Sequence, residues 1–265
     1  LEKENIVTGE KLTLTYDERG QLTRAILPNS GSIQYLIDGE GKRVMRSLNG
    51  VTTHAFLYDL QGRLVAELDP SGVMRSRFIY ATQTHSPDYM IRDGANYYFA
   101  KDQLGSIRAV VDSNGGTITQ LIQYDEFGRV LSDSNPGFQP FGFAGGHYDH
   151  QTGLVRFGAR DYDAEIGRWL SKDPILFEGD QNNLYAYIDS NPVNLVDSTG
   201  TRATVLEPAQ DIDLGGGGGA IELGCPASAV AGAAIFDLFM QSSRKGERNQ
   251  TAKPDGTSNP FKHMK

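Results

Sequence analysis

The side chains best suited to metal binding lie in one short stretch of the chain, where His147 and His150 flank Asp149. Imidazole nitrogens and carboxylate oxygens bind zinc, but a closed zinc site needs four ligands at turn or helical spacing. No further ligand stands at such a spacing, so we expect two exposed loop histidines and predict neither a metal nor another cofactor. The only cysteine, Cys225, excludes an internal disulfide and a cysteine-based zinc site.

The aromatic residues are a second group that could do chemistry, because sugar rings stack on their faces. Trp169 and the tyrosines near it could form such a platform. Aromatic residues beside glycines in strands are more often part of a core. We therefore expect Trp169 to be a core residue.

The elements that position these side chains are predicted to be strands. The 265 residues include 31 glycines and 12 tyrosines, a composition that favours many short strands and tight turns. The net charge is −8, and all of this acidity falls within the first 200 residues. An acidic surface argues against nucleic-acid binding by that part, since phosphate groups need a positive field.

An Asp-x-x-Gly motif recurs in the first half of the chain. Aspartate caps a turn with its own side chain, and glycine supplies the positive φ that a tight hairpin needs. One such unit cannot bury its own face, so we expect successive hairpins to coil into a continuous sheet; an ordinary β-meander is the alternative. The motif occurs at Asp17 to Gly20, Asp38 to Gly41, Asp59 to Gly62, Asp102 to Gly105 and Asp125 to Gly128, the first three 21 residues apart.

Three of these motifs follow a tyrosine and resemble YD repeats: Tyr16-Asp17, Tyr58-Asp59 and Tyr124-Asp125. The segment 141–200 resembles the core associated with Rhs repeats. Nearly the whole segment matches, as seen in Gly153-Leu154-Val155-Arg156-Phe157-Gly158-Ala159-Arg160-Asp161-Tyr162, Gly167-Arg168-Trp169-Leu170-Ser171-Lys172-Asp173-Pro174, Asn183-Leu184-Tyr185-Ala186-Tyr187 and Asn191-Pro192-Val193-Asn194. The chain is therefore similar to the Rhs/YD-repeat family, which includes C subunits of insecticidal toxin complexes; teneurins carry a similar shell.

The resemblance implies a mainly β fold in three parts. YD-repeat hairpins would form a partial shell over residues 1–133, the Rhs core would form a plug over 134–200, and 201–265 would be a variable tail. In bacterial members the core acts like an aspartyl protease on its own chain and releases a C-terminal toxin that stays inside the shell. The implied partners are that toxin segment, upstream YD repeats, a secretion-system component and an immunity protein.

The resemblance also implies the site residues. Asp173 and Asp197 would be the catalytic carboxylates and Arg160 a third catalytic group, with the cut between Thr201 and Arg202 or, as second choice, before Thr201. One protonated carboxyl would donate to the scissile carbonyl while the other activates water. Arg160 would either hold this geometry or stabilise the negative charge that develops.

The two aspartate motifs depart from the family pattern Asp-Pro-x-Gly, because they read Asp173-Pro174-Ile175-Leu176 and Asp197-Ser198-Thr199-Gly200. The alternative interpretation is that both aspartates only form turns.

The tail changes composition after Gly200. Gly215 to Gly219 is linker-like, Ala229 to Met240 predicts a short helix that cannot span a bilayer, and a disordered polar end follows. The chain begins at Leu1 without a signal peptide, so we expect a larger secreted or cell-surface bacterial protein whose targeting signal lies elsewhere. Two functions stay open: a shell that releases a toxin, or a non-catalytic surface module that binds glycans or a protein.

Overall fold

A computed structural model describes residues 1–4, 9–179, 183–188 and 191–205. All of them belong to one compact unit, Leu1–Gly215. The predicted glycine linker, short helix and polar end lie outside the described residues. No helix within the described residues is long and apolar enough to cross a membrane.

The main element is an antiparallel sheet of 13 strands that pair in chain order. Residues alternate between its faces as the strand period requires; in β4, Ile33 and Tyr35 are buried while Gln34 and Leu36 are exposed. The strands are β1 (Glu2–Glu4), β2 (Lys11–Tyr16), β3 (Leu22–Ile26), β4 (Ser32–Ile37), β5 (Arg43–Leu48), β6 (Val51–Tyr58), β7 (Leu64–Leu68), β8 (Met74–Ile79), β9 (Tyr89–Arg92), β10 (Ala95–Lys101), β11 (Ile107–Asp112), β12 (Ile118–Tyr124) and β13 (Val130–Asp133).

The Asp-x-x-Gly motifs form the hairpin turns that were predicted. In the third motif, the Asp59 carboxylate accepts hydrogen bonds from the amides of Gln61 at 3.0 Å and Arg63 at 2.9 Å. Gly62 closes the turn with φ +76° and donates to the Asp59 carbonyl at 2.9 Å. The pairing register shifts by one residue just before this turn, which adds twist to the sheet.

The five predicted turns lie at the same end of the sheet, here called the motif end. Consecutive strands run antiparallel, so the connections alternate between the two ends. Outside these five, the Asp-x-x-Gly sequence from Asp69 to Gly72 forms the same hydrogen bonds but joins β7 to β8 at the opposite end. The turn chemistry of this motif therefore occurs at both ends of the sheet.

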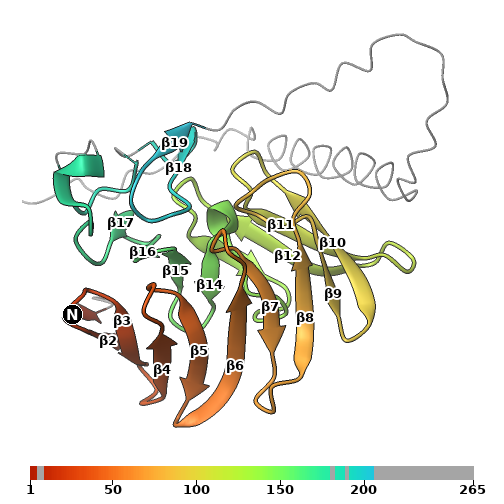
Figure 1. Ribbon diagram of the computed structural model, residues 1–265, viewed down its shortest axis with the longest axis horizontal. Helices are drawn as coiled ribbons and strands as arrows, with labels where there is room; N and C mark the ends of the chain where they lie inside the picture. Colours follow the sequence, from red (N-terminus) through yellow and green to blue (C-terminus); the bar gives the residue numbers. More distant parts are fainter. Residues whose placement is uncertain (5–8, 180–182, 189–190, 206–265) are drawn as a thin grey trace, which may run out of the picture. The chain divides into compact units, whose positions relative to one another are not determined.

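The second element is a plug that packs on the concave face of the sheet (Figure 1). Three buried clusters join the two. Leu154 belongs to a cluster with Leu14 and Leu22 of the sheet, Phe141 packs edge-on against Phe78 of β8, and the largest cluster contains Trp169. The plug contains η1 (Phe143–Gly145), β14 (His147–Asp149), β15 (Leu154–Phe157), β16 (Arg160–Asp163), β17 (Arg168–Trp169), η2 (Leu176–Gly179), β18 (Leu195–Val196) and β19 (Thr204–Val205).

Buried ion pairs also link the sheet to the plug. Arg46 of β5 donates to Asp149 at 2.8 Å, and Tyr35 of β4 donates to the same carboxylate at 2.6 Å. Arg43 of β5 donates to Asp161 of β16 at 2.8 Å. We call this set of contacts the charged seam.

The predicted fold class is confirmed. The strand order is that of a meander, but the sheet curves around a packed plug, as the shell prediction requires. The short register shifts before the motif turns supply part of this curvature, because each bulge bends and twists its strand.

Candidate active site

The structure brings together the three residues predicted to be catalytic. Arg160 is the first residue of β16, Asp173 follows β17, and Asp197 directly follows β18. Nη2 of Arg160 lies 2.8 Å from Oδ2 of Asp173 and 3.2 Å from Oδ2 of Asp197. All three side chains are almost fully buried.

The positive charge of the Arg160 guanidinium acts on both carboxylates. Burial lowers the pKa of Arg160, while the charges of Asp173 and Asp197 act in the opposite direction. The guanidinium also stacks on Trp169, with its central carbon 4.2 Å from the ring centroid. A cation in this position offsets the mutual repulsion of two neighbouring carboxylates.

The same groups contact the backbone beside Thr201. Nε of Arg160 donates to the carbonyl oxygen of Gly200 at 2.5 Å. Oδ1 of Asp197 accepts hydrogen bonds from the amides of Thr201 at 3.0 Å and Arg202 at 3.1 Å. The Gly200–Thr201 peptide is therefore contacted at its carbonyl and at its nitrogen, and the Thr201–Arg202 peptide at its nitrogen.

Both aspartates also form turns, as the alternative interpretation expects. Asp173 accepts from the amide of Ile175 through Oδ1, at 3.0 Å. Asp197 uses Oδ1 for its turn as well. In each residue the other oxygen, Oδ2, contacts Arg160. Turn formation thus accounts for one oxygen of each carboxylate and leaves the other for the guanidinium.

A close backbone contact holds the Asp197 turn against the plug. Ala159, between β15 and β16, donates to the carbonyl of Thr199 at 2.9 Å. A side chain at Gly200 would place its Cβ 2.2 Å from the carbonyl oxygen of Phe157, and one at Gly158 would meet the carbonyl of Thr199 at 2.2 Å. Glycine at both positions permits this approach.

The Asp173 motif differs from the family pattern at Leu176, and the structure shows what that position demands. Leu176 has φ +54°, a left-handed conformation that glycine adopts without strain. Its side chain is exposed. The motif therefore keeps its turn conformation although the glycine is absent.

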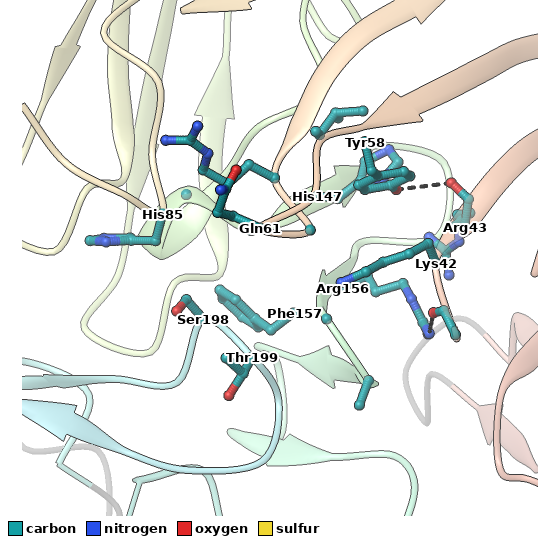
Figure 2. Close-up of a pocket in the computed structure, with 18 of the residues that line it drawn as sticks. Lys42, Arg43, Tyr58, Gln61, His85, His147, Arg156, Phe157, Ser198 and Thr199 are labelled. Carbon is teal, nitrogen blue, oxygen red and sulfur yellow. Dashed lines mark hydrogen bonds between the residues drawn. The ribbon is translucent and has the colours of Figure 1, made fainter. Parts of the chain in front are cut away.

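A cavity of about 470 Å³ lies between the motif end of the sheet and the plug. Lys42, Arg63 and Arg156 give its lining positive charge. Figure 2 shows Ser198 and Thr199 near Phe157 at its border, so the cavity reaches the turn that contains Asp197.

The histidines differ from the sequence prediction in one respect. His150 is exposed, as predicted, but the prediction of an exposed loop position for His147 is wrong. His147 belongs to β14, is partly buried and packs edge-on against Phe56 at 4.5 Å between ring centroids. Asp149 is engaged by Arg46 and Tyr35. Among the described residues no group of three His, Cys, Asp or Glu is placed to hold a metal.

Trp169 lies in the core, as predicted, because its ring packs against Phe157, Tyr162 and Tyr187. Two features were missed. The first is a pair of sequences, Asp69 to Gly72 and Asp112 to Gly115, which fit the motif pattern and could have been found by it. The Thr199 hydroxyl, which donates to Asp197 at 3.1 Å, gives no signal in a single sequence.

Comparison with known proteins identifies the family of this fold. A family model described as Teneurin YD-shell matches residues 5–193. The chain belongs to the teneurin YD-shell family. The predicted Rhs/YD-repeat relationship is thereby confirmed.

The relatives of this YD-shell chain are much longer proteins. Teneurin-3 of Danio rerio is 36% identical over 197 residues, which cover 68% of this chain and 7% of the relative. The tRNA3(Ser)-specific nuclease WapA of Bacillus spizizenii is 28% identical over 204 residues, which cover 74% and 9%. The crystal structure of TcdB2-TccC3 has the same fold, with a TM-score of 0.55 and 23% identity over 75% of this chain and 11% of that one.

Proposed function

We propose that this YD-shell chain is the C-terminal shell and plug segment of an Rhs-type polymorphic toxin that cuts its own backbone next to Thr201. The observation that carries the proposal is the position of Arg160, which contacts Asp173, Asp197 and the carbonyl of Gly200 at once. The relative named as a nuclease, WapA, supports a toxin context. In this proposal residues 1–133 are shell, 134–200 plug and 201–265 the start of the released part.

The proposed reaction is hydrolysis of one peptide bond in the same chain. Arg160 stabilises the negative charge that develops on the carbonyl oxygen, and Asp197 with Asp173 moves the protons. Because the bond is held in the site by the fold, a high effective concentration allows weak catalytic groups to suffice for one turnover.

The contacts support Gly200–Thr201 as the bond that is cut, with Thr201–Arg202 second. Arg160 donates to the carbonyl of Gly200, whereas Asp197 contacts the nitrogen of both bonds. Activation of a peptide requires charge stabilisation at the carbonyl oxygen. This preference reverses the order that the family resemblance suggested.

The proposed partners are the released C-terminal segment, upstream YD repeats, a secretion-system component and an immunity protein, and the proposed location is outside a bacterial cell. The likeness to toxin-complex shells supports this setting by fold.

The test is to incubate the purified, folded chain and to follow its intact mass. We expect fragments with a new terminus at Thr201, lost in Asp173→Asn, Asp197→Asn and Arg160→Lys. Asn keeps the Oδ1 acceptor of each turn, so these changes remove the charge and spare the turn. Asp69→Asn is the matched control, because its turn lies at the opposite end of the sheet. A folded chain that stays intact would refute self-cleavage and favour a non-catalytic module that binds glycans or a protein.

A further inference from the structure

We propose that the nucleophile of this cleavage is the hydroxyl of Thr201 itself, which attacks the Gly200 carbonyl and converts the Gly200–Thr201 peptide into an ester. The inference rests on the proposed self-cleavage and adds the identity of the attacking atom. It also decides the bond, because a threonine hydroxyl reaches the carbonyl that precedes its own nitrogen.

The first observation is a directed chain of hydrogen bonds. Thr199 Oγ1 lies 3.1 Å from Oδ1 of Asp197 and 2.9 Å from Oγ1 of Thr201. A carboxylate only accepts, so the single hydroxyl proton of Thr199 points to Asp197. The hydroxyl of Thr201 must then donate to Thr199. This arrangement aligns a path along which the Thr201 proton reaches the carboxylate.

The second observation is that one carboxylate oxygen contacts both ends of the proton transfer. Oδ1 of Asp197 accepts from the Thr199 hydroxyl and also from the amide nitrogen of Thr201, at 3.0 Å. The atom that receives the proton from the nucleophile therefore lies next to the nitrogen that must gain one when the peptide breaks.

The third observation is the hydrogen bond to the Gly200 carbonyl, the group that would be attacked. The Gly200 carbonyl oxygen accepts a hydrogen bond of 2.5 Å from Nε of the buried Arg160. A cationic donor at this oxygen stabilises the oxyanion that forms when Oγ1 adds to the carbonyl carbon. The close contact of Gly200 with Phe157 keeps the peptide in this place.

The proposed cleavage needs no reagent other than water. Oγ1 of Thr201 forms a bond to the Gly200 carbon, and its proton passes through Thr199 to Asp197. The bond between that carbon and the Thr201 nitrogen then breaks, and Asp197 returns the proton to the departing amine. Water hydrolyses the resulting ester, which gives a Gly200 carboxylate, a free Thr201 hydroxyl and a free Thr201 amine.

Water can reach this ester. Thr199 is exposed and Thr201 is partly exposed. The cavity bordered by Ser198 and Thr199 lies on the same turn (Figure 2). Arg160, Asp173 and Asp197, in contrast, are almost fully buried. Solvent therefore reaches the hydroxyls of Thr199 and Thr201, whereas the three charged side chains are shielded from it.

The experiment compares substitutions of Thr201 in the full chain by intact-mass spectrometry, with circular dichroism to verify the fold. Thr201→Val removes the nucleophile and keeps the shape of the side chain, so we expect loss of cleavage. Thr201→Ser should cut at the same bond. Thr204→Val makes the same chemical change three residues away and should cut as the wild type does. Hydroxylamine should speed release from the wild type and leave a hydroxamate on Gly200, because it captures an ester.

A second variant keeps the test decisive if Thr201→Val does not fold. Thr201→Cys would form a thioester, so added dithiothreitol should accelerate its cleavage, whereas dithiothreitol should not change the wild-type rate.

The outcomes separate this inference from the proposed function. If folded Thr201→Val is cut at the wild-type bond and rate, or if the wild type is cut between Thr201 and Arg202, the hydroxyl is not the nucleophile and water attacks directly, while self-cleavage stands. If the folded wild type is never cut, self-cleavage fails and this inference fails with it.

Discussion

The hydroxyl of Tyr58 donates a hydrogen bond of 2.9 Å to the carbonyl oxygen of Arg43, 15 residues earlier in the chain. Tyr80 donates to Leu64 at 2.8 Å, and Tyr124 donates to Ile107 at 3.1 Å. Each tyrosine stands where a strand ends at the motif end of the sheet. Two of these, Tyr58 and Tyr124, are tyrosines of YD repeats, and each connects the end of one strand to the start of the preceding strand. The hydroxyl of Tyr16, in the first YD repeat, has no such partner among the described residues.

Loss of this connection should weaken the sheet. Tyr58→Phe removes the hydroxyl and keeps the ring, so we expect the free energy of unfolding to fall by about 1 kcal/mol. Denaturant unfolding measures the change. Tyr98→Phe is the control, because that hydroxyl makes no hydrogen bond to another described residue, although its ring contacts Tyr89. Equal losses in the two variants would show that the hydrogen bond to Arg43 does not stabilise the fold.

The charged seam predicts a large difference between two arginines. Arg46→Met leaves the carboxylate of Asp149 buried without its ion pair, so we expect a loss of about 3–5 kcal/mol in the free energy of unfolding. Arg129→Met removes an exposed partner of Asp125, for which we expect about 0.5 kcal/mol or less. Chemical denaturation compares the two. A small effect of Arg46→Met would mean that the seam tolerates an unpaired carboxylate.

The left-handed backbone conformation of Leu176 predicts that a glycine at this position stabilises the fold. Its φ of +54° strains any residue with a Cβ, so Leu176→Gly should raise the free energy of unfolding by about 0.5–1 kcal/mol. The control is Leu60→Gly, because Leu60 is also exposed but does not have a positive φ. That change should destabilise the chain, since glycine gains freedom mainly in the unfolded state. The prediction fails if both variants lose stability in thermal unfolding.

His147 predicts that the fold weakens in mild acid. Burial and the nearby charge of Arg43 lower the pKa of His147 from 6.5 to about 3. The unfolded chain therefore binds a proton near pH 6.5, while the folded chain does so only near pH 3, and stability is lost as the pH falls between these values. We expect a loss of roughly 1–2 kcal/mol between pH 7 and pH 5 from this residue. His147→Gln should reduce the pH slope of the melting temperature, and His150→Gln, at an exposed site, should not.

The repeated part of the fold could be predicted because its signals are local. An aspartate and a glycine three residues apart make a turn by themselves, and Leu12 and Leu14 alternate with polar neighbours in the pattern of a half-buried strand. The turn at Asp69 follows the same rule. The position of His147 could not be predicted, because its burial depends on Phe56, a residue of another sheet.

The site could be predicted only in part. The resemblance named Arg160, Asp173 and Asp197, and the structure places them in contact. A single sequence cannot show how each carboxylate divides its oxygens between a turn and a guanidinium. It also cannot show that Arg43 and Arg46 pair with plug residues more than 100 positions away.

The short strand β19 is one of the contacts by which a cut chain would hold its product. On the far side of the proposed bond, β19 pairs with β18 through two residues, Thr204 donates to Val196 and Arg202 donates to Glu178. The amides of Thr201 and Arg202 also donate to Asp197, and Ala203 packs on the core. Each such bond contributes on the order of 1 kcal/mol. After cleavage, these contacts would still hold residues 201–205 on the plug. Breaking the backbone and letting the product leave would then be two separate events, the second one governed by a dissociation rate.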